Sequence, residues 1–409
     1  MKDYNTLDYF DLENKTVLLR VDFNMPLDKD TFEILDTTRI ERALPTINEL
    51  IEKNAKTVIL AHQGRKGSWD FISLKRHAKA LENLLGRSVK YVDDLYGEEA
   101  QNAITNMNNG DVILLGNVRK FDGETDNKTA EEHSHSELVQ NLCQLADIFV
   151  NDAFAAAHRS QCSLLGFTAL MPSCAGRLME KELTTLEEII ANPQKPSVFL
   201  FGGAKFSDVI VTIERLLDKK TADNIILTGL PANAFLKAKG VKLGEKNEEI
   251  LAKEGKTEDY EEIKKLLEKY NDNIFLPLDF AIEENSNRNE IDASDLPTSY
   301  NLFDIGEKSI NKFKDVISSA KTVFLSGPCG VFENPAFMKG TEEIFSYVAN
   351  SEVFSIVGGG HTVAAVEKLG LENKISHIST GGGSLEKFMM GEKLPVIEAL
   401  KTARDRKKQ

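Results

Sequence analysis

Arginine and histidine residues recur just after apolar segments in the first half of the chain. Each segment is rich in β-branched residues, lacks polar alternation and ends in polar or glycine positions; the segments are residues 15–22, 56–64, 111–119 and 146–154. Such segments are typical of parallel strands buried on both faces, whose carboxyl ends meet at one edge of a sheet. The residues expected at that edge are Asp22, Asn24, Arg39, His62, Arg65, Arg119, His158 and Arg159.

Arginine is well suited to bind an anion at such an edge. Its planar guanidinium binds carboxylate and phosphate oxygens in pairs, which a lone ammonium group does not do. Any one of these arginines taken alone is more often part of a surface ion pair. Their joint placement after separate strands favours a site for a small molecule that carries a phosphate and a carboxylate.

Glycine-rich motifs take the same places in the second half of the chain. They are GGAK (202–205), TGL (228–230), SGP (326–328), GGGHT (358–362) and STGGG (379–383). Glycine lets backbone N–H groups approach phosphate oxygens closely, and a helix that starts there adds a favourable dipole. Each motif alone also suits a tight turn, but several together indicate a nucleotide site. The sequence contains neither the P-loop pattern nor a strand-linked G-x-G-x-x-G, so the phosphate site is of another type.

Three charged residues of the second half have two interpretations each. Lys205 is placed to direct an ammonium at the outer phosphates or at a phosphoryl group in transit, or it is a surface cation beside a turn. Glu333 either accepts a ribose hydroxyl or caps the following helix. Asp279 is either linked to a metal or structural, and we favour the structural interpretation.

Length and segment order predict the architecture. A chain of 409 residues exceeds what one core usually organises, which indicates two domains. Apolar strands alternate with helical stretches, so we predict two doubly wound α/β domains with mainly parallel sheets. Residues 177–190 have apolar positions at helical spacing, and we interpret them as a connecting helix, although a helix within one domain fits equally well. The Lys- and Glu-rich segment 244–270 predicts solvated surface helices.

Composition excludes several classes of protein. The net charge of −14, with no long basic run, opposes binding to nucleic acid or to anionic membranes. The four cysteines show neither disulfide nor zinc-ligand spacing, which favours a reducing compartment. The polar, acidic start and the absence of a long apolar run predict a cytoplasmic protein without a membrane span.

Taken together, these motifs resemble phosphoglycerate kinases over nearly the whole chain. The motifs that carry the resemblance are VLLRVDFNMPL (17–27), TTRI (37–40), AHQGR (61–65), LLGNVR (114–119), NDAFAAAHR (151–159), GGAKFSD (202–208), SGPCGVFENPAFMKGT (326–341), GGGHT (358–362) and SHISTGGGSLE (376–386). The resemblance implies reversible phosphoryl transfer between ATP and 3-phosphoglycerate, giving ADP and 1,3-bisphosphoglycerate with the help of Mg²⁺. It also implies a hinged cleft between the domains, which closes before transfer and excludes water.

The resemblance further implies roles for individual residues. Those of the 3-phosphoglycerate site are Asp22, Asn24, Arg39, His62, Arg65, Arg119 and Arg159. Arg39 and Lys205 are implied to stabilise the phosphoryl group during transfer. Those of the nucleotide site are Gly203, Ala204, Lys205, Gly229, Ser326, Gly327, Glu333, Gly359, Gly360 and Thr362. No protein ligand to the metal is assigned.

The resemblance also sets the domain limits. We expect a 3-phosphoglycerate domain of residues 1–176 plus 391–409, because the last segment returns to the first domain in this family. A connecting helix is expected over 177–192, and a nucleotide domain over 193–390. The chain is expected to be a monomer or a homodimer and to act in sugar breakdown or synthesis.

Several positions depart from the bacterial and eukaryotic pattern of the family. Val209 stands where a second Lys is usual, and His361 stands where an Asp is usual. Gly116, Lys120 and Ser326 also differ from that pattern. The GGGHT form resembles the archaeal branch, which accounts for these changes as differences between branches. Two alternatives stay open: a homologue that binds ligands without catalysis, and another two-domain kinase of small molecules.

Overall fold

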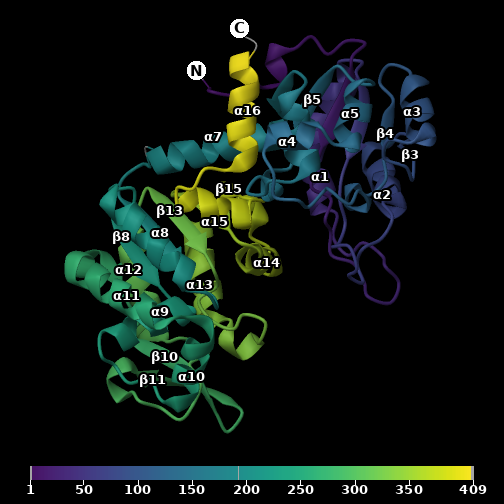
Figure 1. Ribbon diagram of the computed structural model, residues 1–409. Coiled ribbons are helices and arrows are strands. Elements are labelled where there is room, and N and C mark those ends of the chain that lie inside the picture. Colours follow the sequence, from purple (N-terminus) through teal and green to yellow (C-terminus); the bar gives the residue numbers. More distant parts are fainter. Residues whose placement is uncertain (1, 192, 407–409) are drawn as a thin grey trace. The chain divides into compact units, whose positions relative to one another are not determined.

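The computed structural model describes residues 2–191 and 193–406, which form two compact units. Unit 1 runs to Thr184 and resumes at Lys393, and unit 2 is Thr185–Glu392 (Figure 1). Each unit contains a parallel sheet with helices on both faces, so the predicted fold class is confirmed. The finer domain limits stay a prediction, and residue 192, the predicted end of the connecting helix, lies outside the described residues.

Unit 1 is built on a six-stranded parallel sheet of order β3-β4-β2-β1-β5-β6. Its strands are β1 (Thr16–Arg20), β2 (Lys56–Leu60), β3 (Lys90–Tyr91), β4 (Val112–Leu114), β5 (Ile148–Asn151) and β6 (Ser173–Ala175). Its helices are α1 (Thr38–Glu52), α2 (Lys75–Leu85), α3 (Glu98–Thr105), α4 (Ala130–Ser134), α5 (Glu137–Cys143), α6 (Cys162–Leu165) and α16 (Pro395–Arg406). The four predicted strands of the first half are all present, and β3 and β6 extend the sheet at its two edges.

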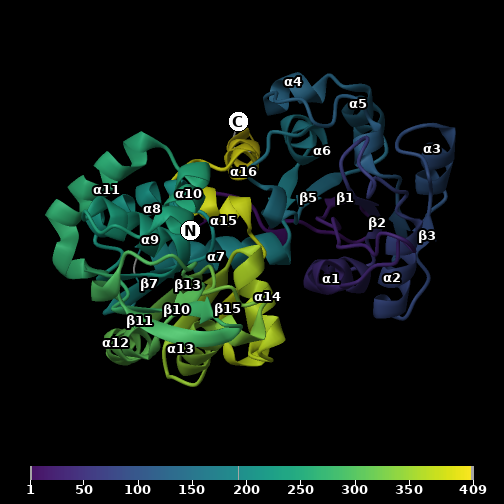
Figure 2. The same ribbon diagram turned by 90° about the horizontal axis from the view of Figure 1, so that it is seen from below.

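Alternate residues of each strand in unit 1 enter opposite cores. Val17 and Leu19 of β1 pack with α1 and α2, whereas Leu18 packs with α3 and α5. Figure 2 shows α1 and α2 on one face of the sheet and α4, α5 and α6 on the other. Because both faces are covered, the strands need apolar residues at consecutive positions, which is the pattern seen in the sequence.

Unit 2 repeats this design with a six-stranded parallel sheet of order β15-β14-β13-β7-β8-β9. Its strands are β7 (Ser197–Phe201), β8 (Asn224–Leu227), β9 (Ile274–Phe275), β13 (Thr322–Ser326), β14 (Phe354–Gly358) and β15 (His377–Ile378). Its helices are α8 (Ser207–Asp218), α9 (Gly229–Ala238), α10 (Glu245–Glu254), α11 (Thr257–Tyr270), α12 (Glu307–Ser318), α13 (Lys339–Ala349), α14 (Gly360–Lys368) and α15 (Gly383–Met389). Helices α10 and α11 are the two surface helices predicted over 244–270.

A small antiparallel sheet of order β11-β10-β12 is an addition that the sequence did not indicate. Its strands are β10 (Asp279–Glu284), β11 (Asn287–Asp292) and β12 (Asp304–Ile305). The segment 273–280 is apolar along most of its length, but only its start joins the parallel sheet, and Asp279 begins the antiparallel one. Pro277 lies between the two pieces and cannot donate to a strand ladder, which explains the break.

Helix α7 (Arg177–Ala191) begins in unit 1 at a buried anchor. The Asp152 carboxylate, which is fully buried, accepts hydrogen bonds from the Met179 N–H (2.9 Å) and the Thr46 hydroxyl (2.6 Å). Burial raises the pKa of Asp152 to about 6, although these hydrogen bonds oppose the rise. Asp152 of the NDAF motif therefore fixes the first turn of the predicted connecting helix.

Arg177 ties the same helix start to two other parts of unit 1. Its guanidinium binds both carboxylate oxygens of Glu49 (2.6 and 2.8 Å), and it also contacts Asp8 and Glu180 at 2.7 Å each. These contacts lower the pKa of Glu49. A lone surface ion pair contributes little, but a network held by paired contacts contributes more.

No helix within the described ranges is both long enough and apolar enough to cross a bilayer.

Replacing Arg177 with Met is expected to lower the free energy of unfolding by about 1–3 kcal/mol at pH 7, because the partly buried carboxylates of Glu49 and Glu180 and the exposed carboxylate of Asp8 lose their cation. The pKa of Glu49 is depressed in the folded state, so its stabilising effect is present above its unfolded pKa and is lost as the pH falls through its folded pKa. The difference between wild type and variant in urea unfolding should therefore shrink below about pH 4.5.

The control is Lys53→Met, which removes only a surface pair with Glu49 at 2.8 Å. It should change the stability by about 0.5 kcal/mol or less. Equal losses in the two variants would show that the network adds nothing beyond a surface pair.

Candidate functional site

The polar residues predicted in the first half follow four neighbouring strands of unit 1. In the sheet order, Arg119 follows β4, His62 and Arg65 follow β2, Asp22 and Asn24 follow β1, and His158 and Arg159 follow β5. Arg39 belongs to the first turn of α1. The parallel sheet thus brings residues from distant parts of the sequence to its carboxyl edge, where ligands bind in such folds.

A cavity of about 520 Å³ opens at this edge. Its charged and polar lining includes Arg65, Lys66, Arg119, Asp122, His158, Arg159 and Gln161. Asp122 is the single acid of this lining, and it pairs with Lys66. The remaining charge is supplied by three guanidinium groups, so the cavity is suited to an anion.

Asp22 and Asn24 organise the backbone beside this cavity. The Asp22 carboxylate pairs with Arg39 at 2.7 Å and accepts the Asn24 N–H at 3.0 Å. The amide oxygen of Asn24 accepts the Gly64 N–H at 2.9 Å, directly before Arg65. Burial alone would raise the pKa of Asp22, but the nearby cations, with Arg39 foremost, hold it below its ordinary value. Asp22 is therefore a largely buried anion that orients Arg39.

His62 is buried and faces the buried guanidinium of Arg20. Its Nδ1 lies 3.1 Å from Nη2 of Arg20. Because a guanidinium only donates hydrogen bonds, Nδ1 must accept, and the ring proton resides on Nε2. Burial, with the guanidinium groups of Arg20 and Arg119, holds the pKa of His62 well below its ordinary value. His62 is thus a neutral donor.

Arg20, Ser163 and Glu124 form a buried layer that the sequence analysis missed. Arg20 is fully buried and donates from Nε to the Ser163 hydroxyl at 2.8 Å. Glu124 accepts the Ser163 hydroxyl (2.7 Å) and N–H (2.8 Å). The sequence does contain a signal for Arg20, which is a charged residue inside an otherwise apolar strand segment. A charge at such a position must have buried partners.

The side chain of Arg119 is buried, and one of its hydrogen-bond donors has no partner. Its Nη1 donates to the Gly64 carbonyl, while its Nε is buried and has no hydrogen-bond partner. Burial, together with the repulsion from Arg159 and Arg20, lowers the pKa of Arg119 to about 10. The group stays charged at neutral pH, and an anion in the cavity would lower the cost of burying it.

Unit 2 has a second cavity, of about 340 Å³, at the carboxyl edge of its parallel sheet. It contains most of the predicted nucleotide residues, namely Gly203, Ala204, Lys205, Ser326, Gly327, Gly359, Gly360 and Thr362. Its apolar wall includes Phe201, Phe324, Leu385 and Met389. A cavity with backbone amides on one side and an apolar wall on the other is suited to a molecule with both phosphates and a flat ring.

The glycine turns of this cavity pack directly on one another. Gly327 has φ +93°, and a Cβ placed there would lie 2.3 Å from the backbone of Gly202. The Gly327 N–H donates to the Thr362 hydroxyl at 2.7 Å, and Gly203 donates to the Pro328 carbonyl at 2.9 Å. Glycine is therefore required by close packing as well as by the left-handed conformation.

Two of the predicted nucleotide residues do not line the cavity. Gly229 has φ +57° and lies behind Gly203, and a Cβ there would meet the Gly203 carbonyl at 2.5 Å. Glu333 is exposed on the loop after β13. Gly229 therefore supports the turn, and Glu333 stays a prediction for the outer part of the site.

The cavity in unit 2 also contains carboxylates that the sequence analysis did not assign. Asp208 and Glu386 line it together with Lys205, and both occur in quoted motifs. Burial raises the pKa of Glu386, and the nearby Lys205 partly offsets the rise. Among the described residues, no group of three or more His, Cys, Asp or Glu side chains is arranged to hold a metal ion.

Val209 and His361, the two departures from the familiar pattern, both line this cavity. Asp279, by contrast, is structural. Its carboxylate accepts the N–H groups of Lys308 (2.9 Å) and Ser309 (2.8 Å) and so caps α12. This arrangement agrees with the structural interpretation of Asp279.

The comparisons with known proteins decide the family. A family model described as phosphoglycerate kinase matches residues 7–392. The chain belongs to the phosphoglycerate kinase family. It is 44% identical over 406 residues to the phosphoglycerate kinase of Methanothermus fervidus, covering 99% of both chains. It is 47% identical over 412 residues to that of Methanococcus maripaludis, covering 98% of this chain and 99% of the relative.

Solved structures agree with this assignment. The crystal structure of phosphoglycerate kinase from Pyrococcus horikoshii OT3 superposes with a TM-score of 0.90 at 39% identity, over 98% of this chain and 99% of that chain. The structure of phosphoglycerate kinase from Coxiella burnetii gives a TM-score of 0.83 at 34% identity, with the same coverage of each chain. The expected archaeal character agrees with the archaeal sources of these two relatives by sequence.

The predicted activity is confirmed by this membership. Phosphoglycerate kinases transfer a phosphoryl group between ATP, taken with Mg²⁺, and the carboxyl group of 3-phosphoglycerate. The alternative of a homologue that binds ligands without catalysis is not supported.

The tautomer of His62 is open to direct measurement. In nitrogen NMR of histidine-labelled protein, His62 should show an unprotonated Nδ1, a protonated Nε2 and no titration between about pH 5.5 and 8. The His62→Gln variant identifies the resonance. In Arg20→Met, the fixed tautomer should be lost. A His62 resonance that titrates near pH 6.5 in the wild type would contradict the burial argument.

Proposed function

We propose that unit 1 binds 3-phosphoglycerate or 1,3-bisphosphoglycerate in its arginine-lined cavity. The observation that supports this most directly is the buried, unpartnered Nε of Arg119 in a cavity it shares with Arg65 and Arg159. A substrate with a phosphate and a carboxylate supplies oxygen acceptors for several guanidinium groups at once. In this proposal His62 donates from Nε2 to a substrate oxygen, and Asp22 and Asn24 hold the surrounding loop.

We propose that unit 2 binds ADP or ATP in its glycine-lined cavity. The turn at Gly359 leads directly into α14, which begins at Gly360, so the backbone amides and the dipole of this helix start favour the phosphates. The apolar wall at Phe201, Phe324 and Leu385 is suited to the base. Mg²⁺ bound to the nucleotide would supply neutralisation of the phosphate charge.

For the chemical step, we propose that Arg39 and Lys205 stabilise the phosphoryl group in transit. Phosphoryl transfer depends on positioning and on charge stabilisation more than on covalent help. Asp22 holds Arg39 in place at 2.7 Å, and Lys205 is exposed at the mouth of the nucleotide cavity. Both cations are thus available to a substrate.

The remaining expectations about partners follow from the charge of the chain. With a net charge of −14, we expect no binding to nucleic acid or to anionic membranes. We further propose a cytoplasmic enzyme that is a monomer or a homodimer, with a hinge between its two domains.

Replacing Lys205 with Ala should lower kcat about 100- to 1,000-fold and leave the KM for 3-phosphoglycerate nearly unchanged, because the ammonium acts mainly on the transferred group. The measurement is a coupled assay of ATP-dependent phosphorylation of 3-phosphoglycerate. Lys246→Ala, which removes another exposed cation of unit 2, is the matched control and should keep the wild-type rate. A normal kcat in Lys205→Ala would remove Lys205 from the mechanism.

Replacing Arg119 with Met should raise the KM for 3-phosphoglycerate by about 30-fold or more, because a buried guanidinium contact to the substrate is lost. The KM for ATP should stay within about twofold, since Arg119 lies in unit 1. Arg87→Met, an exposed arginine of the same unit, is the control and should leave both constants unchanged. An equal rise in both KM values would point to a general loss of structure.

A further inference from the structure

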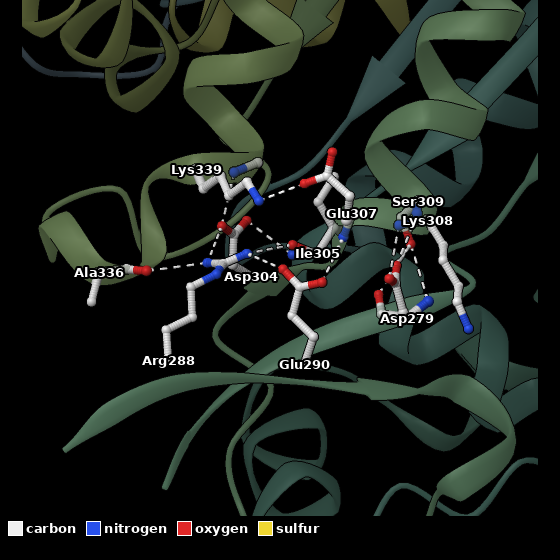
Figure 3. A network of polar contacts seen from close by, with 11 residues as sticks. Asp279, Arg288, Glu290, Asp304, Ile305, Glu307, Lys308, Ser309, Ala336 and Lys339 are labelled. Atoms are coloured by element: carbon white, nitrogen blue, oxygen red, sulfur yellow. Dashed lines mark hydrogen bonds and ion pairs between the residues drawn. The ribbon is translucent and has the colours of Figure 1, made fainter. Parts of the chain in front are cut away.

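The loop between β13 and α13, residues 327–338, carries Gly327 and Glu333 of the proposed nucleotide site. Its first residues are fixed by the glycine turns and by Thr362. Its middle and its end pack against the small antiparallel sheet, which lies outside the cavity lining (Figure 3).

Asp304 of β12 is the centre of this contact. Its side chain has no exposed surface, and its Oδ2 accepts both Nη1 of Arg288 and the Gly340 N–H at 2.8 Å. Its Oδ1 accepts the Ile305 N–H at 2.9 Å. Burial raises the pKa of Asp304, whereas Gly340 and Arg288 oppose the rise. Removal of Asp304 would leave buried donors without an acceptor.

Two glycines allow the loop to approach this carboxylate. A Cβ at Gly330 would lie 2.4 Å from Oδ1 of Asp304, and one at Gly340 would lie 2.3 Å from it. The Val331 N–H also donates to the Phe303 carbonyl at 2.8 Å. The loop is thus held against β12 on both sides of Glu333.

Arg288 of β11 extends the same contact to the far part of the loop. Its Nη1 donates to the Ala336 carbonyl at 3.1 Å, and its Nη2 donates to the Ile305 carbonyl at 2.9 Å. Its guanidinium lies 5.9 Å from the ring of Phe337, which packs on Phe303 at 4.8 Å. One guanidinium therefore joins β11, β12 and the loop, as Figure 3 shows.

We infer that Asp304 and Arg288 are positioning residues for nucleotide binding: they hold the loop that carries Glu333 in the conformation that the nucleotide needs. The inference rests on the proposed nucleotide site and adds to it a pair of residues that contact no substrate. The energetic argument is preorganisation, because an exposed loop fixed before binding loses less conformational entropy when the ligand arrives.

The test is Asp304→Asn, which keeps the size of the side chain between Gly330 and Gly340 but replaces one acceptor oxygen with a donor group. We expect the KM for ATP, and the Kd for Mg²⁺–ADP in an equilibrium titration, to rise about tenfold. The KM for 3-phosphoglycerate should change by less than about twofold, because it is bound in the other unit. Arg288→Gln should shift the nucleotide constants in the same direction.

Asp279→Asn is the matched control. Asp279 is also a buried carboxylate of the small sheet that accepts backbone N–H groups, but its contacts are with the start of α12. This variant should lose stability in urea unfolding as Asp304→Asn does, yet keep the wild-type Kd for Mg²⁺–ADP. Equal nucleotide constants in the two variants would show that Asp304 has only a structural role and would overturn the inference.

Glu333→Ala separates this inference from the proposed function. If Glu333→Ala weakens Mg²⁺–ADP binding and neither Asp304→Asn nor Arg288→Gln does, the positioning role is wrong and the proposed nucleotide site stands. If none of the three variants changes nucleotide binding, both the positioning role and the nucleotide role of this loop are wrong. If Asp304→Asn does not fold, Arg288→Gln carries the same comparison.

Discussion

The buried guanidinium of Arg20 is the constraint on which the proposed substrate site of unit 1 depends. A fully buried cation at the end of β1 is costly unless its donors are satisfied, and Ser163, Val21 and His62 provide the acceptors. Burial lowers the pKa of Arg20, and the negative charge of Glu124 opposes that effect. The same arrangement leaves His62 neutral and makes it a donor. A layer beneath the site therefore sets the chemical character of a residue at its surface.

The sequence was sufficient to bring Arg65, Arg119, His158 and Arg159 to one cavity of unit 1, because each follows an apolar strand and parallel strands share one edge. The sequence did not predict that Arg20, Glu124 and Gln161 belong to this site or to the layer beneath it. Glu124 and Ser163 lie far from Arg20 in the chain, and only the packing of separate segments brings them together. Gln161 lines the cavity but belongs to no strand-end pattern. Local rules find residues positioned by the sheet, whereas buried partners are decided by tertiary packing.

In unit 2 too, local rules find the apolar strands of the sheet, whereas other parts of the fold depend on tertiary packing. Apolar segments mark long strands such as β7 and β13 in the sequence, whereas β12 has only two residues and its pairing is set by its neighbours rather than by composition. The antiparallel sheet was missed because its strand β11 is polar and contains no buried residue. Polar strands carry no apolar signal, and here Arg288 and Asp304 supply the fixing contacts instead of a hydrophobic face.

The departures at Val209 and His361 change the charge that lines the proposed nucleotide cavity. Its ionisable lining contains one ammonium, Lys205, against the carboxylates Asp208 and Glu386, together with His361. Such a lining attracts a bare polyphosphate only weakly, because the carboxylates repel it. Binding must then depend on the backbone amides of the glycine turns and the start of α14, which add attraction without side-chain charge. It must also depend on the Mg²⁺ that the nucleotide brings, since the cation offsets the phosphate charge that a second lysine would otherwise have met.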